Sequence, residues 1–189
     1  MNQPLILASA SPRRQQLLRE AEIAFESCPA QIAEERRAGE APVEYACRLA
    51  REKAEAVAQR FAGRYVLGAD TIVVVEDEVL EKPRDGADAA RMLRRLSGRA
   101  HSVTTAVSLV GPGGRLDTRS ATTQVFFRKI AEKEIAEYIA SGEPMDKAGA
   151  YAIQGGAARW TDRVAGDYSN VVGLPLALVN EMLRANEFF

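Results

Sequence analysis

The sequence is poor in the side chains that bind zinc. It contains two cysteines, Cys28 and Cys47, which form no CxxC or similar spacing, and a single histidine, His101. Because zinc sites are built from clustered thiolates and imidazoles, this composition argues against such a site. A metal bound here would be a hard cation held by carboxylate and phosphate oxygens. Two cysteines without a pattern also favour a reducing compartment.

Long apolar runs and an excess of one charge are lacking as well. No stretch approaches the roughly 20 apolar residues of a membrane-spanning helix. The first arginines follow a short apolar run, whereas an export signal needs them before a longer one. Basic and acidic side chains nearly balance, at 25 and 26, and no basic stripe with aromatic residues is present. We therefore expect a cytoplasmic protein without membrane or nucleic-acid partners, in which a local basic cluster binds any anionic ligand.

The spacing of apolar residues predicts an α/β protein with a mixed sheet and helices around it, folded as one domain over residues 1–189. Near the N-terminus we expect a buried strand at 4–8, a helix capped by Ser11, a mobile polar loop at 31–40 and a helix from Pro42 to about Phe61. Further along we expect two strands with a polar interruption at 65–80, a helix at 85–97 and a hairpin at 101–127. A helix at 131–141, a glycine-rich region at 144–174 and a last helix from Pro175 complete the chain.

The first motif that could carry chemistry is the turn Ser9-Ala10-Ser11-Pro12-Arg13-Arg14. A helix N-terminus directs free N–H groups and a positive partial charge outward, which suits an anion. Arg13 and Arg14 are unfavourable beside that positive end unless a phosphate binds there. The alternative is a capped surface helix with two solvated arginines.

The second motif is Gly68-Ala69-Asp70-Thr71, set between apolar strand residues. A carboxylate in apolar surroundings is costly unless it has a partner or a function. At a strand end, Asp70 could bind a divalent cation or take a proton from a water molecule. The alternative is a turn aspartate that accepts nearby backbone N–H groups. Gly68 would allow backbone or ligand to approach closely.

Weaker candidates are distributed along the chain. Lys53 and Lys82 could each provide a point charge for a phosphate, although most such lysines are solvated. Glu34 and Glu35 could contribute to a metal site. Gln154 follows a short β run between glycines and carries both a donor and an acceptor, as the reading of a base edge requires. Taken alone, that stretch is better explained by an ordinary hairpin with exposed polar side chains. A P-loop is excluded because GxxxxGK[ST] does not occur.

Seven motifs occur in a fixed order, namely SASPRR, RLAREKA, GADTIV, EKP, ARMLRRLSG, MDKAGAYAIQG and VVGLPL. In identity and order they resemble the Maf family over about residues 5–178. The resemblance implies a mixed-sheet α/β fold with two lobes around a cleft, similar to the inosine triphosphate pyrophosphatase group. It also implies hydrolysis of a nucleoside triphosphate to the monophosphate and pyrophosphate with a divalent cation, Mg²⁺ or Mn²⁺.

The resemblance further implies roles for individual residues. Asp70 would accept the proton, and Glu34 or Glu35 would lie on the family's acidic loop as metal ligands. Whether Asp70 acts as base, as metal ligand or as both is left open by the sequence. The phosphates would be bound by Ser9, Ser11, Arg13, Arg14, Lys53 and Lys82. Arg13, Thr71 and Gln154 correspond to the positions that set substrate choice, and their combination is similar to the branch that acts on dTTP and UTP.

The resemblance leaves the cellular setting open. A homodimer is compatible with it, as are roles in cleaning the nucleotide pool and in arresting cell division. The alternative from another functional class is a non-catalytic regulator of cell division that senses nucleotides.

Overall fold

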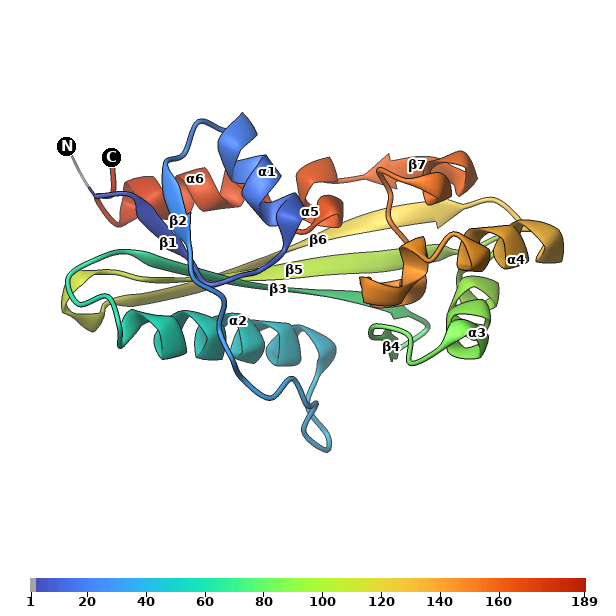
Figure 1. The fold of residues 1–189 in the computed structure, drawn as a ribbon, viewed down its shortest axis with the longest axis horizontal. Helices are drawn as coiled ribbons and strands as arrows, with labels where there is room; N and C mark the ends of the chain where they lie inside the picture. The colour runs from blue at the N-terminus through green and yellow to red at the C-terminus, as the bar shows by residue number, and fades with distance from the viewer. Residues whose placement is uncertain (1–2) are drawn as a thin grey trace. The chain divides into compact units, whose positions relative to one another are not determined.

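The computed structural model describes residues 3–189, in which a seven-stranded sheet is flanked by helices (Figure 1). The strands are β1 (Leu5–Leu7), β2 (Phe25–Ser27), β3 (Val66–Val75), β4 (Glu78–Leu80), β5 (Ala100–Val110), β6 (Leu116–Phe127) and β7 (Thr161–Ala165). They lie in the order β2-β1-β3-β5-β6-β7, and β4 also pairs with β3. β1 is parallel to β2 and β3, whereas β4 is antiparallel to β3, and β7 to β6. The expected mixed α/β sheet is therefore confirmed.

The helices are α1 (Pro12–Glu20), α2 (Pro42–Ala58), α3 (Gly86–Leu96), α4 (Glu132–Ala140), α5 (Tyr168–Val172) and α6 (Leu176–Ala185). Short 3₁₀ turns are η1 (Pro112–Gly114), η2 (Glu143–Asp146), η3 (Ala148–Ala150) and η4 (Gly156–Trp160). Ser11 caps α1 as expected, since its hydroxyl accepts from the Arg14 amide. Within residues 3–189, no helix has the length and apolar character needed to cross a membrane.

The chain divides into two compact units. The first comprises Met1–Asp70, Thr105–Ala121 and Gly173–Phe189, and the second comprises Thr71–Thr104 and Thr122–Val172. The boundary passes through β3, so Asp70 belongs to the first unit and Thr71 to the second.

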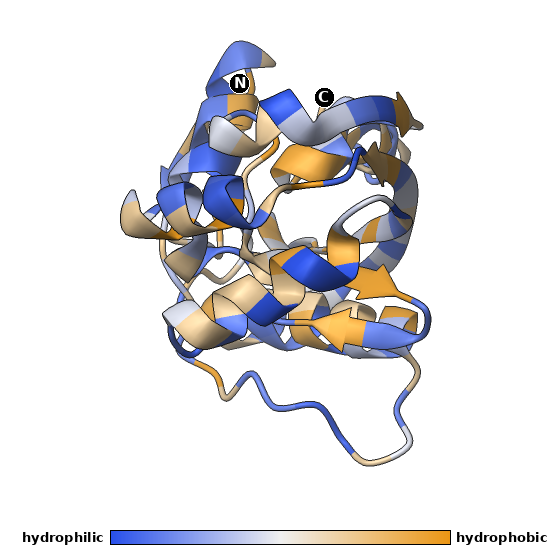
Figure 2. Cartoon of the chain, turned by 90° about the vertical axis from the view of Figure 1, so that its right-hand side faces the viewer, coloured by the Kyte–Doolittle hydropathy of each residue, from blue (hydrophilic) through white to orange (hydrophobic). Residues whose placement is uncertain are grey.

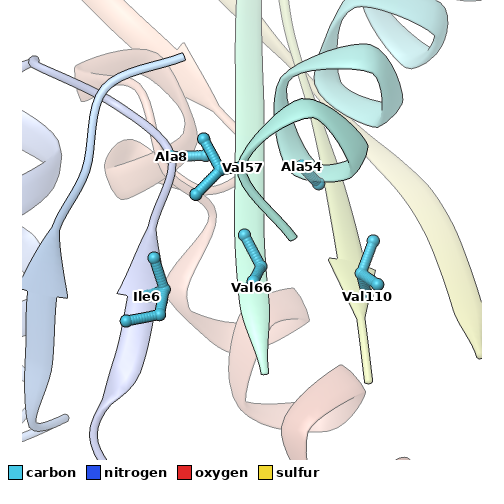
Figure 3. Packing of buried hydrophobic residues seen from close by; sticks show 6 residues of the cluster. All are labelled: Ile6, Ala8, Ala54, Val57, Val66 and Val110. Carbon is cyan, nitrogen blue, oxygen red and sulfur yellow. The ribbon is translucent and has the colours of Figure 1, made fainter. Parts of the chain in front are cut away.

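The first unit has an apolar core between β1, β3, β5 and α2. Figure 3 shows the buried side chains that form it, Ile6, Ala8, Ala54, Val57, Val66 and Val110. Helix α2 lies on one side of these strands and α6 on the other (Figure 1). Close packing of α2 on β3 depends on Gly68, because a Cβ atom there would lie 2.2 Å from the Ala50 carbonyl oxygen. The expectation that this glycine permits a close backbone approach is confirmed.

The second unit has an aromatic core. Edge-to-face contacts join His101, Phe127, Tyr151, Trp160 and Tyr138, with neighbouring ring centroids 4.8 to 6.3 Å apart. Tyr138 belongs to α4 and Trp160 ends η4, so the cluster joins the helical part of this unit to strands β5 and β6. Edge-to-face geometry is the favoured arrangement of aromatic rings.

Two expectations about local structure are wrong, and one strand was missed. The polar interruption predicted near Asp70 does not exist, because β3 continues without a break from Val66 to Val75. No strand forms at Tyr151–Gln154, where the chain enters a turn stabilised by side chains of α4 and η2. Strand β2 was not expected, because its three residues show no clear alternation of apolar and polar side chains. They form a strand through pairing with β1.

Candidate active site

A buried carboxylate, a buried ammonium group and a second carboxylate lie in contact in the first unit. Lys53 Nζ is 2.7 Å from Asp70 Oδ1 and 2.7 Å from Glu34 Oε1. Asp70 and Lys53 are 7% and 8% exposed, whereas the Glu34 side chain is 44% exposed. Asp70 lies inside β3, Lys53 on α2, and Glu34 in the segment that precedes α2. The structure thus brings together three of the residues singled out in the sequence.

The serine–arginine turn belongs to the same unit. Arg14 donates from Nη1 to Ser9 Oγ at 3.1 Å and from Nε to the Gly173 carbonyl at 2.8 Å. Ser9 Oγ also accepts from the Ser11 amide at 3.2 Å. Burial lowers the pKa of Arg14, and the negative charge of Asp70 acts in the opposite direction. The arginine is therefore a partly desolvated cation within electrostatic reach of Asp70, and the reading as a solvated surface arginine is wrong for Arg14. Arg13 is half-buried on α1.

The environment of Asp70 changes its acidity. Burial raises the pKa of Asp70 above its usual value, while Lys53 and Arg14 act to lower it and Glu34 to raise it. A carboxylate with a raised pKa holds a proton more tightly than a solvated aspartate does. Such a group is a better general base, because proton transfer is most effective when the pKa approaches the working pH.

No group of three His, Cys, Asp or Glu side chains suited to a metal ion occurs within residues 3–189. Two of the three predicted ligands, Asp70 and Glu34, meet at Lys53, and Glu35 is exposed. Carboxylate oxygens are the donor type that Mg²⁺ and Mn²⁺ take, and such ions commonly use one or two of them and complete their shell with oxygens from substrate phosphates and water.

The second unit contains the other candidates. Thr71 follows Asp70 in β3, and Lys82 is exposed just after β4. The Glu81 carbonyl, next to Lys82, accepts from the Gly149 amide at 3.1 Å. Two motifs that are far apart in the sequence, EKP and DKAGA, are therefore neighbours in this unit.

Gln154 lies exposed on the turn that follows Tyr151. The Glu143 carboxylate accepts from the Gly156 amide at 3.1 Å and from the Tyr138 hydroxyl at 2.7 Å, and that hydroxyl accepts from the Ala152 amide at 3.0 Å. A Cβ atom at Gly155 would lie 2.0 Å from the Glu143 carboxylate. The missing side chain of Gly155 thus makes room for the Glu143 carboxylate.

Sequence reasoning missed the residues that support Glu34. Arg48 donates from Nη2 to the Glu35 carbonyl at 2.9 Å, and Tyr45 Oη donates to the Glu34 carbonyl at 3.1 Å. A signal was present in the sequence, because Arg48 interrupts the inward apolar face of α2 between Tyr45 and Leu49. A charged residue at such a position needs a buried partner.

Comparison with known proteins identifies the family. The family model described as Maf-like protein matches residues 4–186. The chain belongs to the Maf-like protein family. It is 57% identical over 180 residues to the dTTP/UTP pyrophosphatase of Koribacter versatilis, covering 95% of this chain and 93% of that protein. The dTTP/UTP pyrophosphatase of Geobacter sulfurreducens is 52% identical over 181 residues, covering 95% of each chain.

Solved structures with a similar fold include Ham1 proteins. The Ham1 protein of Staphylococcus aureus matches this Maf-like chain with a TM-score of 0.54 and 14% identity, over 97% of this chain and 99% of that one. A HAM1 protein from Coxiella burnetii matches with the same score and identity, over 97% and 100%. At this level of identity the likeness concerns the fold alone.

Proposed function

We propose that this Maf-like protein is a nucleoside triphosphate pyrophosphatase that hydrolyses dTTP and UTP to the monophosphate and pyrophosphate. The observation that carries the proposal is the buried contact between Asp70 and Lys53. Glu34 also contacts Lys53, and the hydrogen-bonded pair of Arg14 and Ser9 belongs to the same unit. The substrate assignment rests on the names of relatives that are 50% to 57% identical over nearly the whole chain.

The residues suit hydrolysis of a phosphoanhydride. Asp70 accepts a proton from the attacking water as the water oxygen bonds to phosphorus and the α–β anhydride bond breaks. Lys53 and Arg14, both held by hydrogen bonds, stabilise negative charge that develops on the phosphate oxygens. Serine hydroxyls at the start of α1 offer further donors to an anion.

A divalent cation is part of the proposal. Asp70 and Glu34 would hold it, and Glu34 is preferred to Glu35 because its carboxylate lies 2.7 Å from Lys53 Nζ, which also contacts Asp70. Bound there, Mg²⁺ or Mn²⁺ would neutralise phosphate charge and polarise the anhydride.

The remaining assignments follow from the family resemblance. Arg13, Thr71 and Gln154 would select the base, and Ser11 and Lys82 would contact phosphates. Both cysteines are free thiols, which suits the reducing cytoplasm. We retain the homodimer, and roles in nucleotide pool cleaning or cell division arrest, as parts of this proposal.

A substrate panel tests the function. Purified protein is incubated with canonical and modified nucleoside triphosphates in Mg²⁺, Mn²⁺ or EDTA, and the products are separated. We expect release of pyrophosphate from dTTP and UTP that stops in EDTA. Release of orthophosphate would contradict the cleavage position. Binding of nucleotides without turnover would favour the nucleotide-sensing regulator instead.

A further inference from the structure

The segment 31–40 forms no helix or strand, and Figure 2 shows it as mostly hydrophilic, yet it is joined firmly to α2. Arg48 Nε and Nη2 donate to the two Glu40 carboxylate oxygens at 2.6 and 2.8 Å. The side chains of Arg48 and Glu40 are 8% and 10% exposed. A bidentate pair of this kind is both strong and directional. The sequence predicted a mobile polar loop here and gave no sign of this contact with α2.

The same arginine fixes the backbone beside Glu34. Arg48 Nη2 donates to the Glu35 carbonyl at 2.9 Å, and Tyr45 Oη to the Glu34 carbonyl at 3.1 Å. Lys53, on the same helix, then meets the Glu34 carboxylate at 2.7 Å. Helix α2 therefore adds to the Arg48–Glu40 pair two contacts with the backbone of the segment and one with the Glu34 side chain.

Stability alone does not explain why a charged pair lies at this place. Replacing a buried ion pair by apolar residues is often neutral or stabilising, because desolvation offsets the attraction between the charges. What the pair adds is geometry, since a guanidinium fork and a carboxylate meet in one arrangement. The hydrogen bond from Arg48 also lowers the pKa of Glu40 to about 2, so the pair stays ionised at neutral pH.

We propose that Arg48 and Glu40 are positioning residues that hold Glu34 beside the Lys53–Asp70 pair. This inference rests on the proposed function, in which Glu34 helps to bind the divalent cation. Arg48 and Glu40 touch neither substrate nor metal. They act by setting the distance between Glu34 and the buried carboxylate of Asp70.

The test compares Glu40→Gln and Arg48→Lys with Glu181→Gln. The first two break the fork–fork contact while preserving size or charge. The control breaks an exposed ion pair of the same unit, with Arg119, in which Glu181 is 68% exposed. The first readout is the rate at which acetic anhydride modifies Lys53, measured by mass spectrometry. When Glu34 is released, Lys53 should react several-fold faster in Glu40→Gln and in Arg48→Lys, and at the wild-type rate in the control.

The second readout is the Mg²⁺ concentration that gives half-maximal hydrolysis of dTTP. Loss of groups that orient metal ligands commonly weakens metal binding about 10- to 100-fold. We expect a rise of that order in both variants, with a KM for dTTP at saturating Mg²⁺ close to that of wild type.

The two readouts separate the two ideas. An unchanged rate of Lys53 acetylation in Glu40→Gln and Arg48→Lys would overturn the positioning role. Faster acetylation without a change in Mg²⁺ requirement would overturn its connection to catalysis. Absence of turnover in wild type would instead contradict the proposed function, and the acetylation rates would still decide whether the pair holds Glu34.

Discussion

At the scale of single residues, Asp70 combines burial with a cationic partner. Asp70 lies in the middle of β3, a strand that consists mostly of buried apolar residues. The contact with Lys53 offsets the cost of burying its negative charge there. The opposing effects of burial and of Lys53 leave the pKa of Asp70 raised. A second cation, the half-buried Arg14, also lies within electrostatic reach of the Asp70 carboxylate.

Replacing Asp70 by asparagine should abolish most turnover and leave nucleotide binding largely intact. General base catalysis contributes about 10² to 10⁴-fold to a rate, so kcat for dTTP should fall by that order. The amide keeps the shape of the side chain but accepts no proton. Initial-rate kinetics and equilibrium binding of dTTP measure the two effects.

The matched control is Asp117→Asn, which also removes a carboxylate from the first unit. Asp117 pairs with Arg119 and accepts from Asn186, and neither is a candidate site residue. Its kcat should be close to that of wild type. Equal turnover in Asp70→Asn and wild type would remove Asp70 from the catalytic role.

At the scale of elements, the packing of α2 on β3 sets the distance from Lys53 to Asp70. Gly68 lies two residues before Asp70 in β3, and its missing side chain lets the helix backbone approach at Ala50 and Ala54. Lys53 follows in the same helical turn as Ala50 and Ala54. The site geometry is thus a consequence of how one helix lies on one strand.

Gly68→Ala should therefore lower both stability and activity. The added Cβ would meet the Ala50 carbonyl oxygen at 2.2 Å, and backbone cannot move aside as a flexible side chain can. Overpacking of this kind costs about 1 to 3 kcal/mol. Urea unfolding measures the loss, and a displaced α2 should also reduce kcat because it carries Lys53.

Gly86→Ala is the control for that experiment. Gly86 begins α3, and a Cβ there would meet only the end of the Ile139 side chain at 3.3 Å. Alanine favours a helix over glycine by up to about 1 kcal/mol, so stability should be unchanged or slightly higher. Equal stability of Gly68→Ala and Gly86→Ala would contradict the close packing of α2 on β3.

At the scale of the whole molecule, acid should destabilise the chain in two stages. Burial lowers the pKa of His101 from 6.5 to about 4, so between these values the unfolded chain binds a proton that the folded chain does not. The free energy of unfolding therefore decreases as the pH is lowered through this range, by at most about 3 kcal/mol. In the second stage, the ion pairs of Glu40 and Glu134 lose their contribution to stability, because their pKa values are lowered from 4.5 to about 2. That loss begins below pH 4.5 and grows as the pH falls toward 2.

Urea unfolding at pH 7.5, 5.5 and 4.5 tests the first stage. His101→Gln removes the titrating group and can keep a hydrogen bond to Tyr151 Oη, which His101 Nε2 contacts at 2.8 Å. The variant should lose much less stability than wild type between pH 6.5 and 4.5. Equal pH dependence of the two proteins would show that His101 is not the group responsible.

Much of the fold follows from local chemistry that can be read along the chain. Apolar spacing, Ser11 as a helix cap and the turn around Gly113 identify the long hairpin and all the helices but α5 within a few residues. Strand β2 was not found because its three residues form a strand only through pairing with β1. The interruption expected at Asp70 was wrong for a similar reason, since the polar residue is accommodated by Lys53 from another element.

The sequence by itself determined the fold class, the family and the chemical groups of the candidate site, because residue types, their spacing and their order are local properties. Only the tertiary structure decided that Lys53 contacts both Asp70 and Glu34, and that Arg48 and Glu40 hold the segment carrying Glu34. These contacts join residues that are far apart in the chain. They arise from the packing of α2 on β3, where burial and the pairing of charges decide which polar side chains meet.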